Sequence, residues 1–144
     1  MDLRNEVFSH QEKLWILCIG QEVSKKPLSP LLDMVDWYNN QLLAKGLLKN
    51  QIPFEFGSKT LLATTGFLQV SRLLIFGIGD EENLNLTDAK NFLSEIDKAL
   101  EGLGEISPWI IFSKETSSAF ISEINKSRRH SERLSSASIS VSVN

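Results

Sequence analysis

The stretch Ser71–Gly104, SRLLIFGIGDEENLNLTDAKNFLSEIDKALEGLG, decides the fold. Its first part, Arg72–Gly77, is almost entirely apolar, as expected of a strand that is buried on both faces. The two glycines around Ile78 then predict a tight turn, and apolar residues spaced by three and four over residues 89–103 predict an amphipathic helix. A strand, a turn and a helix in this order form half of an α/β unit, in which ligands gather at the turn after the strand.

Further strands are predicted on both sides of this unit. Residues 14–20, LWILCIG, form a continuous apolar run. Residues 58–65 and 108–112 are shorter strand candidates, and strict alternation over residues 137–143 predicts a last strand with one polar face. Partial alternation over residues 3–9 predicts an edge strand that pairs with the first run.

Two more helices are predicted from their start signals and apolar spacing. Ser29 and Pro30 are typical of a helix start, and the apolar spacing continues to Leu43, with Gly46 near the end. Residues 117–128 predict a weaker helix near the end of the chain. In the helix of the opening stretch, we expect the side chain of Thr87 to cap the first free amide groups.

Strands and helices alternate along the chain, and this alternation sets the fold class. It predicts a three-layer α/β/α sandwich with a mixed, mostly parallel sheet. The 144 residues suit a single domain, spanning residues 1–144. The net charge of −3 disfavours nucleic acid as a partner, because such binding relies on Lys and Arg to neutralise phosphates.

The expected location follows from the cysteine count and the terminal segment. Cys18 is the single cysteine, so no internal disulfide can form. The first thirteen residues, MDLRNEVFSHQEK, are too polar for a signal peptide. No apolar run approaches the ~20 residues that a membrane span needs, so no membrane contact is expected. We therefore expect a cytoplasmic protein.

The candidate ligand-binding residues are Gly77, Ile78, Gly79 and Asp80. Glycines let backbone amides approach a phosphate closely at the start of a helix. A dinucleotide-binding fingerprint needs a third glycine at position 82, but that position holds Glu82. The successive carboxylates of residues 80–82 would repel a phosphate, so a tight structural turn is the simpler interpretation.

The residue types that carry catalysis or bind metals lack partners in the sequence. His10 and His130 lie in polar stretches without ligands at metal-binding spacing, and we expect both to be at the surface. Cys18 is predicted to be a buried apolar side chain rather than a reactive thiol. Asp33 and Asp36 are three residues apart on one predicted helix, which is typical of a solvated face. The sequence therefore predicts a non-enzyme with no catalytic residue, no metal site and no cofactor.

A basic cluster near the end of the chain is the remaining charged feature. It comprises Lys126, Arg128, Arg129, His130 and Arg133. In an acidic domain, a cluster of this size is more typical of a solvated helix end than of a phosphate-binding surface.

The order of elements over residues 47–104 resembles the N-terminal domain of the leucyl (cytosol) aminopeptidase family. The likeness is carried by residues 54–62, FEFGSKTLL, by residues 71–79, SRLLIFGIG, and by residues 86–89, LTDA, which open a long helix. The resemblance implies a macro-domain-like fold. In that family the catalytic metal ligands belong to a separate domain whose motifs do not occur here, so no catalytic residue is carried over.

Two functions are compatible with this resemblance. In the family, the N-terminal domain serves oligomer assembly and, in some bacterial members, DNA contacts. The first hypothesis is a non-catalytic interaction or oligomerisation module, with a protein partner or self-association. The alternative is a macro-domain-like binder of a nucleotide or an ADP-ribose-type small molecule at Gly77–Asp80. The sequence leaves open whether residues 138–143 complete this sheet or pair with another chain.

Overall fold

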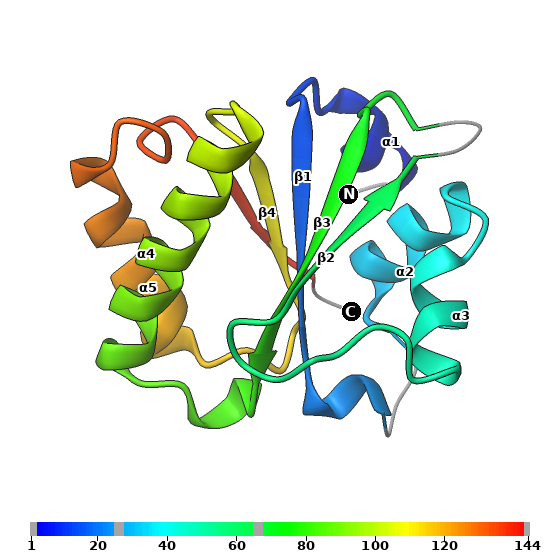
Figure 1. Ribbon diagram of the computed structural model, residues 1–144, viewed down its shortest axis with the longest axis horizontal. Helices are drawn as coiled ribbons and strands as arrows, with labels where there is room; N and C mark the ends of the chain where they lie inside the picture. Colours follow the sequence, from blue (N-terminus) through cyan, green and yellow to red (C-terminus); the bar gives the residue numbers. More distant parts are fainter. Residues whose placement is uncertain (1–2, 25–27, 65–67, 143–144) are drawn as a thin grey trace.

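A five-stranded sheet stands between two layers of helices in the computed structural model, which describes residues 3–24, 28–64 and 68–142 (Figure 1). The strand order is β2-β3-β1-β4-β5, and β2 is antiparallel to β3 while the other pairs are parallel. This confirms the predicted mixed, mostly parallel sheet. The strands are β1 (Leu14–Gly20), β2 (Lys59–Ala63), β3 (Arg72–Gly79), β4 (Trp109–Phe112) and β5 (Ser138–Val141).

The central position of β1 follows from its composition. All seven of its residues are buried, because β3 and β4 flank it and helices cover both faces. The chain returns to the sheet on one side of β1 to form β3 and on the other side to form β4. The carboxyl end of β1 is therefore the topological switch point of the sheet, toward the bottom of Figure 1.

The helices divide between the two faces of the sheet (Figure 1). One face carries α1 (Leu3–Ser9), α2 (Pro30–Tyr38) and α3 (Leu42–Leu48), and the other carries α4 (Leu86–Leu103) and α5 (Ser118–Ser127). Three short 3₁₀ turns, η1 (Gln21–Ser24), η2 (Glu81–Asn83) and η3 (Arg128–His130), follow β1, β3 and α5. None of the helices in the described ranges has the length and apolar character needed to cross a membrane.

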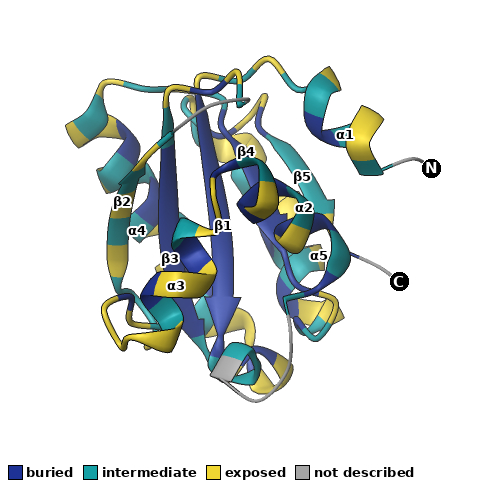
Figure 2. Ribbon diagram, turned by 90° about the vertical axis from the view of Figure 1, so that its right-hand side faces the viewer, coloured by how far each residue is buried: buried dark blue, intermediate teal, exposed yellow. Residues whose placement is uncertain are grey.

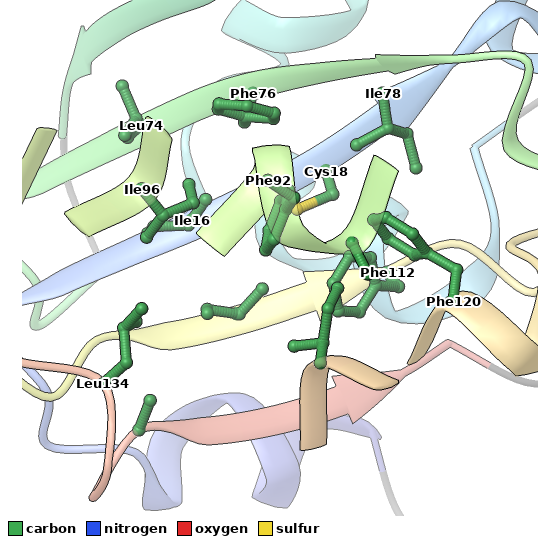
Figure 3. Close-up of a cluster of buried hydrophobic side chains, with 14 of the residues drawn as sticks. Ile16, Cys18, Leu74, Phe76, Ile78, Phe92, Ile96, Phe112, Phe120 and Leu134 are labelled. Carbon is green, nitrogen blue, oxygen red and sulfur yellow. The ribbon is translucent and has the colours of Figure 1, made fainter. Parts of the chain in front are cut away.

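Alternate residues of the strands supply two separate cores. Ile16 and Cys18 of β1 point to the α4–α5 side, while Trp15, Leu17 and Ile19 point to the α2–α3 side. Figure 3 shows the first of these cores, in which the Phe92 ring of α4 lies among phenylalanine rings from β3, β4 and α5. The Phe92 ring centroid lies 5.0 Å from that of Phe76 and 5.6 Å from those of Phe112 and Phe120.

Residues 3–9 form helix α1, so the predicted edge strand is wrong. Both edges of β1 are already paired, with β3 and with β4, which leaves it no edge for another strand. The segment instead buries Val7 in the α2–α3 core and sets the Phe8 ring edge-on to Tyr38.

The helix predicted from Ser29 to Gly46 is interrupted after Tyr38. Asn40 and Gln41 both adopt φ of +58°, which turns the chain before α3 begins. Asp36 holds this turn, because its carboxylate accepts hydrogen bonds from the backbone N–H groups of Leu43 and Ala44 at 2.8 and 3.1 Å. Asp36 is only 1% exposed, so the expectation of a solvated carboxylate pair with Asp33 is wrong.

The cap of helix α4 is Asn85, two residues before the predicted cap at Thr87. The side chain of Asn85 accepts from the backbone N–H of Asp88, and the Asp88 carboxylate accepts from the backbone N–H of Asn85. This reciprocal capping box leaves Thr87 exposed within the first turn. The helix ends at Gly104, whose φ of +69° is the left-handed conformation that glycine favours.

The last strand completes the sheet. β5 pairs in parallel with β4, which answers the question left open for residues 138–143, except that Val143 lies outside the described residues. The Ser138 and Ser140 hydroxyls face the α1 side, and Ile139 packs against the core under α4 and α5. The polar face predicted from the alternation is therefore covered by α1.

Candidate functional site

The turn after β3 contains the predicted ligand-binding residues, and its backbone groups are already paired. The Gly77 N–H donates to the Ser58 carbonyl and the Gly79 N–H donates to the Phe54 carbonyl, both at 2.9 Å. The Gly57 N–H in turn donates to the Gly77 carbonyl at 3.0 Å. Neither glycine of the Gly-x-Gly pattern therefore offers its amide to a phosphate.

Packing against residues 54–58 explains why these positions are glycine. A Cβ atom on Gly77 would collide with the Ser58 hydroxyl and with the Glu55 carbonyl. Gly79 has a φ of +66°, in the left-handed region that other residues rarely adopt. The pattern that resembled a phosphate loop thus serves the contact between the end of β3 and the segment that leads into β2.

Ile78 and Asp80, the other two predicted ligand residues, point to different environments. Ile78 is fully buried and packs in the core under α4, as Figure 3 shows. Asp80 is exposed, and its carboxylate accepts a hydrogen bond from Asn83 Nδ2 at 2.7 Å. The four residues predicted from the sequence do not converge on one site.

Glu81, the next residue along the chain, occupies the carboxyl edge instead. Its side chain is fully buried, and its Oε1 accepts from the backbone N–H of Glu22 at 3.0 Å. Its backbone carbonyl accepts from the N–H of Ser117 at 2.7 Å. A Cβ on Gly20 would occupy the position of the Glu81 carboxylate, so glycine at the end of β1 makes room for it. Glu81 therefore connects the segments that follow β1, β3 and β4.

A cavity of about 10 Å³ adjoins the Glu81 carboxylate. The Glu81 Oε2 and the Ser29 Oγ are both buried without a hydrogen-bond partner. This space, of the order that a single water needs, is lined by Glu22, Val23, Ser29, Leu32, Glu81, Ser113 and Glu115.

The electrostatics of this site favour the uncharged acid. Burial raises the pKa of Glu81 to about 7, the hydrogen bond from the Glu22 N–H opposes that rise, and repulsion from the Glu22 and Glu115 carboxylates adds to it. Within the described ranges, no group of three or more His, Cys, Asp or Glu residues is arranged to hold a metal ion. The sequence analysis placed Glu81 in an acidic run but had no signal for its burial, because the glycine that admits it lies 61 positions earlier, at residue 20.

His10 lies in a second polar cluster, at the end of the strands opposite to Glu81. The expectation that this histidine lies at the surface is wrong. Its ring stacks on Trp109, with centroids 3.5 Å apart and an interplanar angle of 5°. Its Nδ1 lies 2.9 Å from Glu12 Oε1, and its Nε2 lies 3.8 Å from Glu6 Oε1.

The same cluster ties α1 to the two strands beneath it. Ser138 donates to Glu12 at 3.0 Å, Ser140 donates to Glu6 at 3.3 Å, and the indole N–H of Trp109 donates to the Ser140 hydroxyl at 2.9 Å. Burial raises the pKa of Glu12, but hydrogen bonds from His10 and Ser138 outweigh that effect and hold it below its usual value. The polar groups of this cluster are therefore hydrogen-bonded to one another and connect α1 to β4 and β5.

The other candidate residues have structural roles or lie at the surface. Cys18 is fully buried, and burial raises the pKa of its thiol, as a non-reactive cysteine requires. His130 is exposed in η3, as predicted. Arg128, expected at a solvated helix end, instead donates from Nη1 to the carbonyls of Leu134, Ser135 and Ala137 at 3.2, 3.0 and 2.8 Å. Its guanidinium group therefore fixes the turn before β5.

The outer edge of β2 is a surface feature that the sequence analysis did not identify. Figure 2 shows β2 at the margin of the sheet, with exposed positions along it. Gly57, Ser58 and Gly77 form a bulge in which two residues of one strand face one of the other. Beyond it, the register places the backbone groups of Thr60 and Leu62 toward β3 and those of Lys59, Leu61 and Ala63 away from it. The Ala63 carbonyl already accepts a hydrogen bond from Asn39 Nδ2 at 3.3 Å. Leu61 is 47% exposed on this edge.

Comparison with solved structures shows which fold this is. The chain is similar to the macrodomain of Mycobacterium tuberculosis DarG, with a TM-score of 0.58 and 9% identity over 94% of this chain and 91% of that one. It is similar to the macrodomain of Thermus aquaticus DarG, with a TM-score of 0.57 and 9% identity over 96% and 93%. A tomato leucine aminopeptidase mutant, K354E, gives a TM-score of 0.58 and 15% identity over 94% of this chain and 30% of that one.

These likenesses define the fold class: the chain has a macro-domain-like α/β/α fold, as the sequence predicted. The likeness to the aminopeptidase lies in the N-terminal domain of that enzyme, in agreement with the resemblance drawn from residues 47–104. No protein-family model and no curated protein matches the chain. At 9–15% identity, the comparisons extend to the fold and not to the activity.

Proposed function

We propose that this chain is a non-catalytic interaction module that self-associates through the outer edge of β2. The observation that carries the proposal is the row of outward-facing backbone groups at Lys59, Leu61 and Ala63. An open strand edge is a template for pairing with another strand. The half-exposed Leu61 side chain at the middle of that row adds apolar area that water would otherwise cover.

The edge is complementary to itself in one register. A twofold axis at Leu61 sets Leu61 opposite Leu61 of a second copy and Lys59 opposite Ala63. Each such pair exchanges two hydrogen bonds. The Ala63 carbonyl, which already accepts from Asn39 Nδ2, would use its second lone pair for this contact. Like charges do not face each other in this register, since Lys59 meets an alanine.

The carboxyl edge supports the non-catalytic part of the proposal. The amides of Gly77 and Gly79 are paired within the chain, and the Glu81 side chain fills the space at the switch point. Among the described residues, Glu22 and Glu115 make the surroundings of Glu81 acidic, which disfavours a phosphate or a diphosphate there. At the other end of the strands, the His10 ring is stacked on Trp109 and the Glu12 carboxylate accepts a hydrogen bond from Ser138.

Light scattering coupled to size-exclusion chromatography tests the proposal. The wild-type chain should run as a dimer, and Leu61→Arg should run as a monomer because it brings two charges onto the twofold axis. Leu48→Arg is the matched control, since Leu48 is 85% exposed but lies on α3, and it should remain dimeric. A wild-type chain that stays monomeric at its highest soluble concentration would overturn the proposal.

The alternative, a binder of a nucleotide or ADP-ribose, is supported by the likeness of the fold to the DarG macrodomains. Calorimetric titration with ADP-ribose separates the two functions. The paired amides and acidic lining predict no heat of binding at millimolar ligand. Saturable binding that is lost when Gly79 is replaced by Val would favour the alternative instead.

A further inference from the structure

The side chain and the backbone of Glu81 together contact three separate segments at the carboxyl ends of the strands. Its carboxylate lies against Gly20 at the end of β1 and accepts from the Glu22 N–H in η1. Its own backbone, in η2, accepts from Ser117 at the start of α5. The segments after β1, β3 and β4 are therefore joined at one residue.

One half of this carboxyl group is left without a partner. Oε2 borders the cavity of about 10 Å³ together with the buried, unpartnered hydroxyl of Ser29. Among the described residues, the charged groups that face it from the elements packed around it are both acidic: Glu22 from η1 and Glu115 from the β4–α5 connection. The described residues that line the cavity from α2 and its cap, Ser29 and Leu32, carry no charge.

We propose that Glu81 is a protonation-controlled latch on the carboxyl edge. Uncharged, it stays over Gly20 and holds η1 and the β4–α5 connection against η2. Ionised, it is repelled by Glu22 and Glu115, leaves the cavity, and releases these two segments. The switch point of the sheet is closed in the first state and open in the second.

The direction of the switch follows from the surroundings of the group. Burial raises the pKa of Glu81 to about 7, so the change from closed to open falls close to neutral pH. Acidification closes the latch and a rise in pH opens it. One pH unit on either side of the midpoint changes the protonated fraction from about 90% to about 10%.

Hydrogen exchange measured by mass spectrometry tests the latch in the full chain. Peptides that cover residues 20–24 and 113–118 are compared one unit below and one unit above the midpoint, after correction for the intrinsic pH dependence of exchange. Wild type should lose most of its protection in both peptides at the higher pH. Glu81→Gln, which mimics the uncharged acid, should stay protected at both.

Glu82→Gln is the matched control, because Glu82 is the exposed neighbour in the same acidic run and should behave as wild type. Equal wild-type protection at the two pH values, or a loss that persists in Glu81→Gln, overturns the proposal. A measurement that needs no variant is the ¹³C NMR titration of the Glu81 carboxyl carbon. A midpoint near neutrality supports the latch, and a midpoint at the ordinary value for glutamate refutes it.

Discussion

Glu81 and Glu12 are two shielded glutamates at opposite ends of the strands, and their pKa values are shifted in opposite directions. Burial dominates at Glu81, whose carboxylate has one hydrogen-bond donor and two acidic neighbours, so the pKa rises to about 7. Glu12 accepts from His10 and Ser138 and also has a positive partner available in the imidazole, so its pKa falls. The number and charge of the partners decide the sign, not depth alone.

Asp36 gives an intermediate case that supports this rule. It is 1% exposed and accepts two backbone hydrogen bonds, yet its pKa is still raised, with burial as the largest cause. Two neutral donors thus reduce the cost of burying the carboxylate without cancelling it. Asp36 and Glu12 consequently have structural roles, whereas Glu81 is poised to change its charge.

The largest expected effect comes from Glu81→Gln. The pKa of Glu81 is raised from 4.5 to about 7, so its contribution to stability is fully present below 4.5 and is lost as the pH rises through about 7. The difference of about 2.5 pKa units corresponds to roughly 3 kcal/mol, an upper limit if the latch opens. Above pH 7 the variant should therefore be more stable than wild type in urea denaturation, by up to that amount.

The pH dependence of this comparison provides the internal check. The gain from Glu81→Gln should shrink steadily as the pH is lowered toward 4.5, where both side chains are neutral. A gain that is independent of pH would mean that the amide improves packing and that the buried charge is not the cause.

Gly20→Ala should have the next largest effect. The new Cβ takes the position of the Glu81 carboxylate and forces it out of the cavity, at a cost of about 1–3 kcal/mol typical of overpacking. Denaturation at mildly acidic pH measures this loss. In solvent the Glu81 carboxyl should titrate near its ordinary value, so carbon NMR of the variant tests the same displacement. An unchanged titration would show that the β1 end shifts instead.

Glu12→Gln should have the smallest effect, and like Gly20→Ala it should lower the stability. The amide keeps an acceptor for Ser138 but replaces the charge-assisted hydrogen bond with His10 by a neutral one, at a loss of about 1 kcal/mol at neutral pH. Since the pKa of Glu12 is lowered, its contribution is present above 4.5 and is lost as the pH falls through the lowered value. Thermal unfolding should therefore give the variant a lower melting temperature than wild type near neutral pH, and this difference should become smaller at acidic pH. A constant deficit would assign the effect to packing.

The parts of the fold that the sequence predicted are those in which apolar residues are consecutive or regularly spaced. Residues 14–20 and 72–77 became buried strands, and the stripe over residues 89–103 became the inner face of α4, because such segments are buried in any arrangement that excludes water. The strand predicted for residues 3–9 is wrong because its alternation is only partial and because β3 and β4 already occupy both sides of β1.

The sequence points to the turn after β3, but to Gly77, Ile78, Gly79 and Asp80 rather than to the buried Glu81 beside them. Gly77 and Gly79 were selected for a pattern that serves close packing against residues 54–58. In the sequence Glu81 is one of three successive acids and nothing distinguishes it, although it alone of residues 80–82 is buried. Its environment combines the ends of β1, β3 and β4, and nothing in the local sequence shows that these ends meet.

The sequence by itself determined the alternation of buried strands and amphipathic helices, and with it the α/β/α class, because hydrophobic periodicity is a local property of the chain. Only the tertiary structure decided which acid is deprived of water, which histidine is covered by a tryptophan, and which strand edge stays open. These outcomes depend on contacts between residues that are distant in the chain, such as Gly20 with Glu81 and His10 with Trp109.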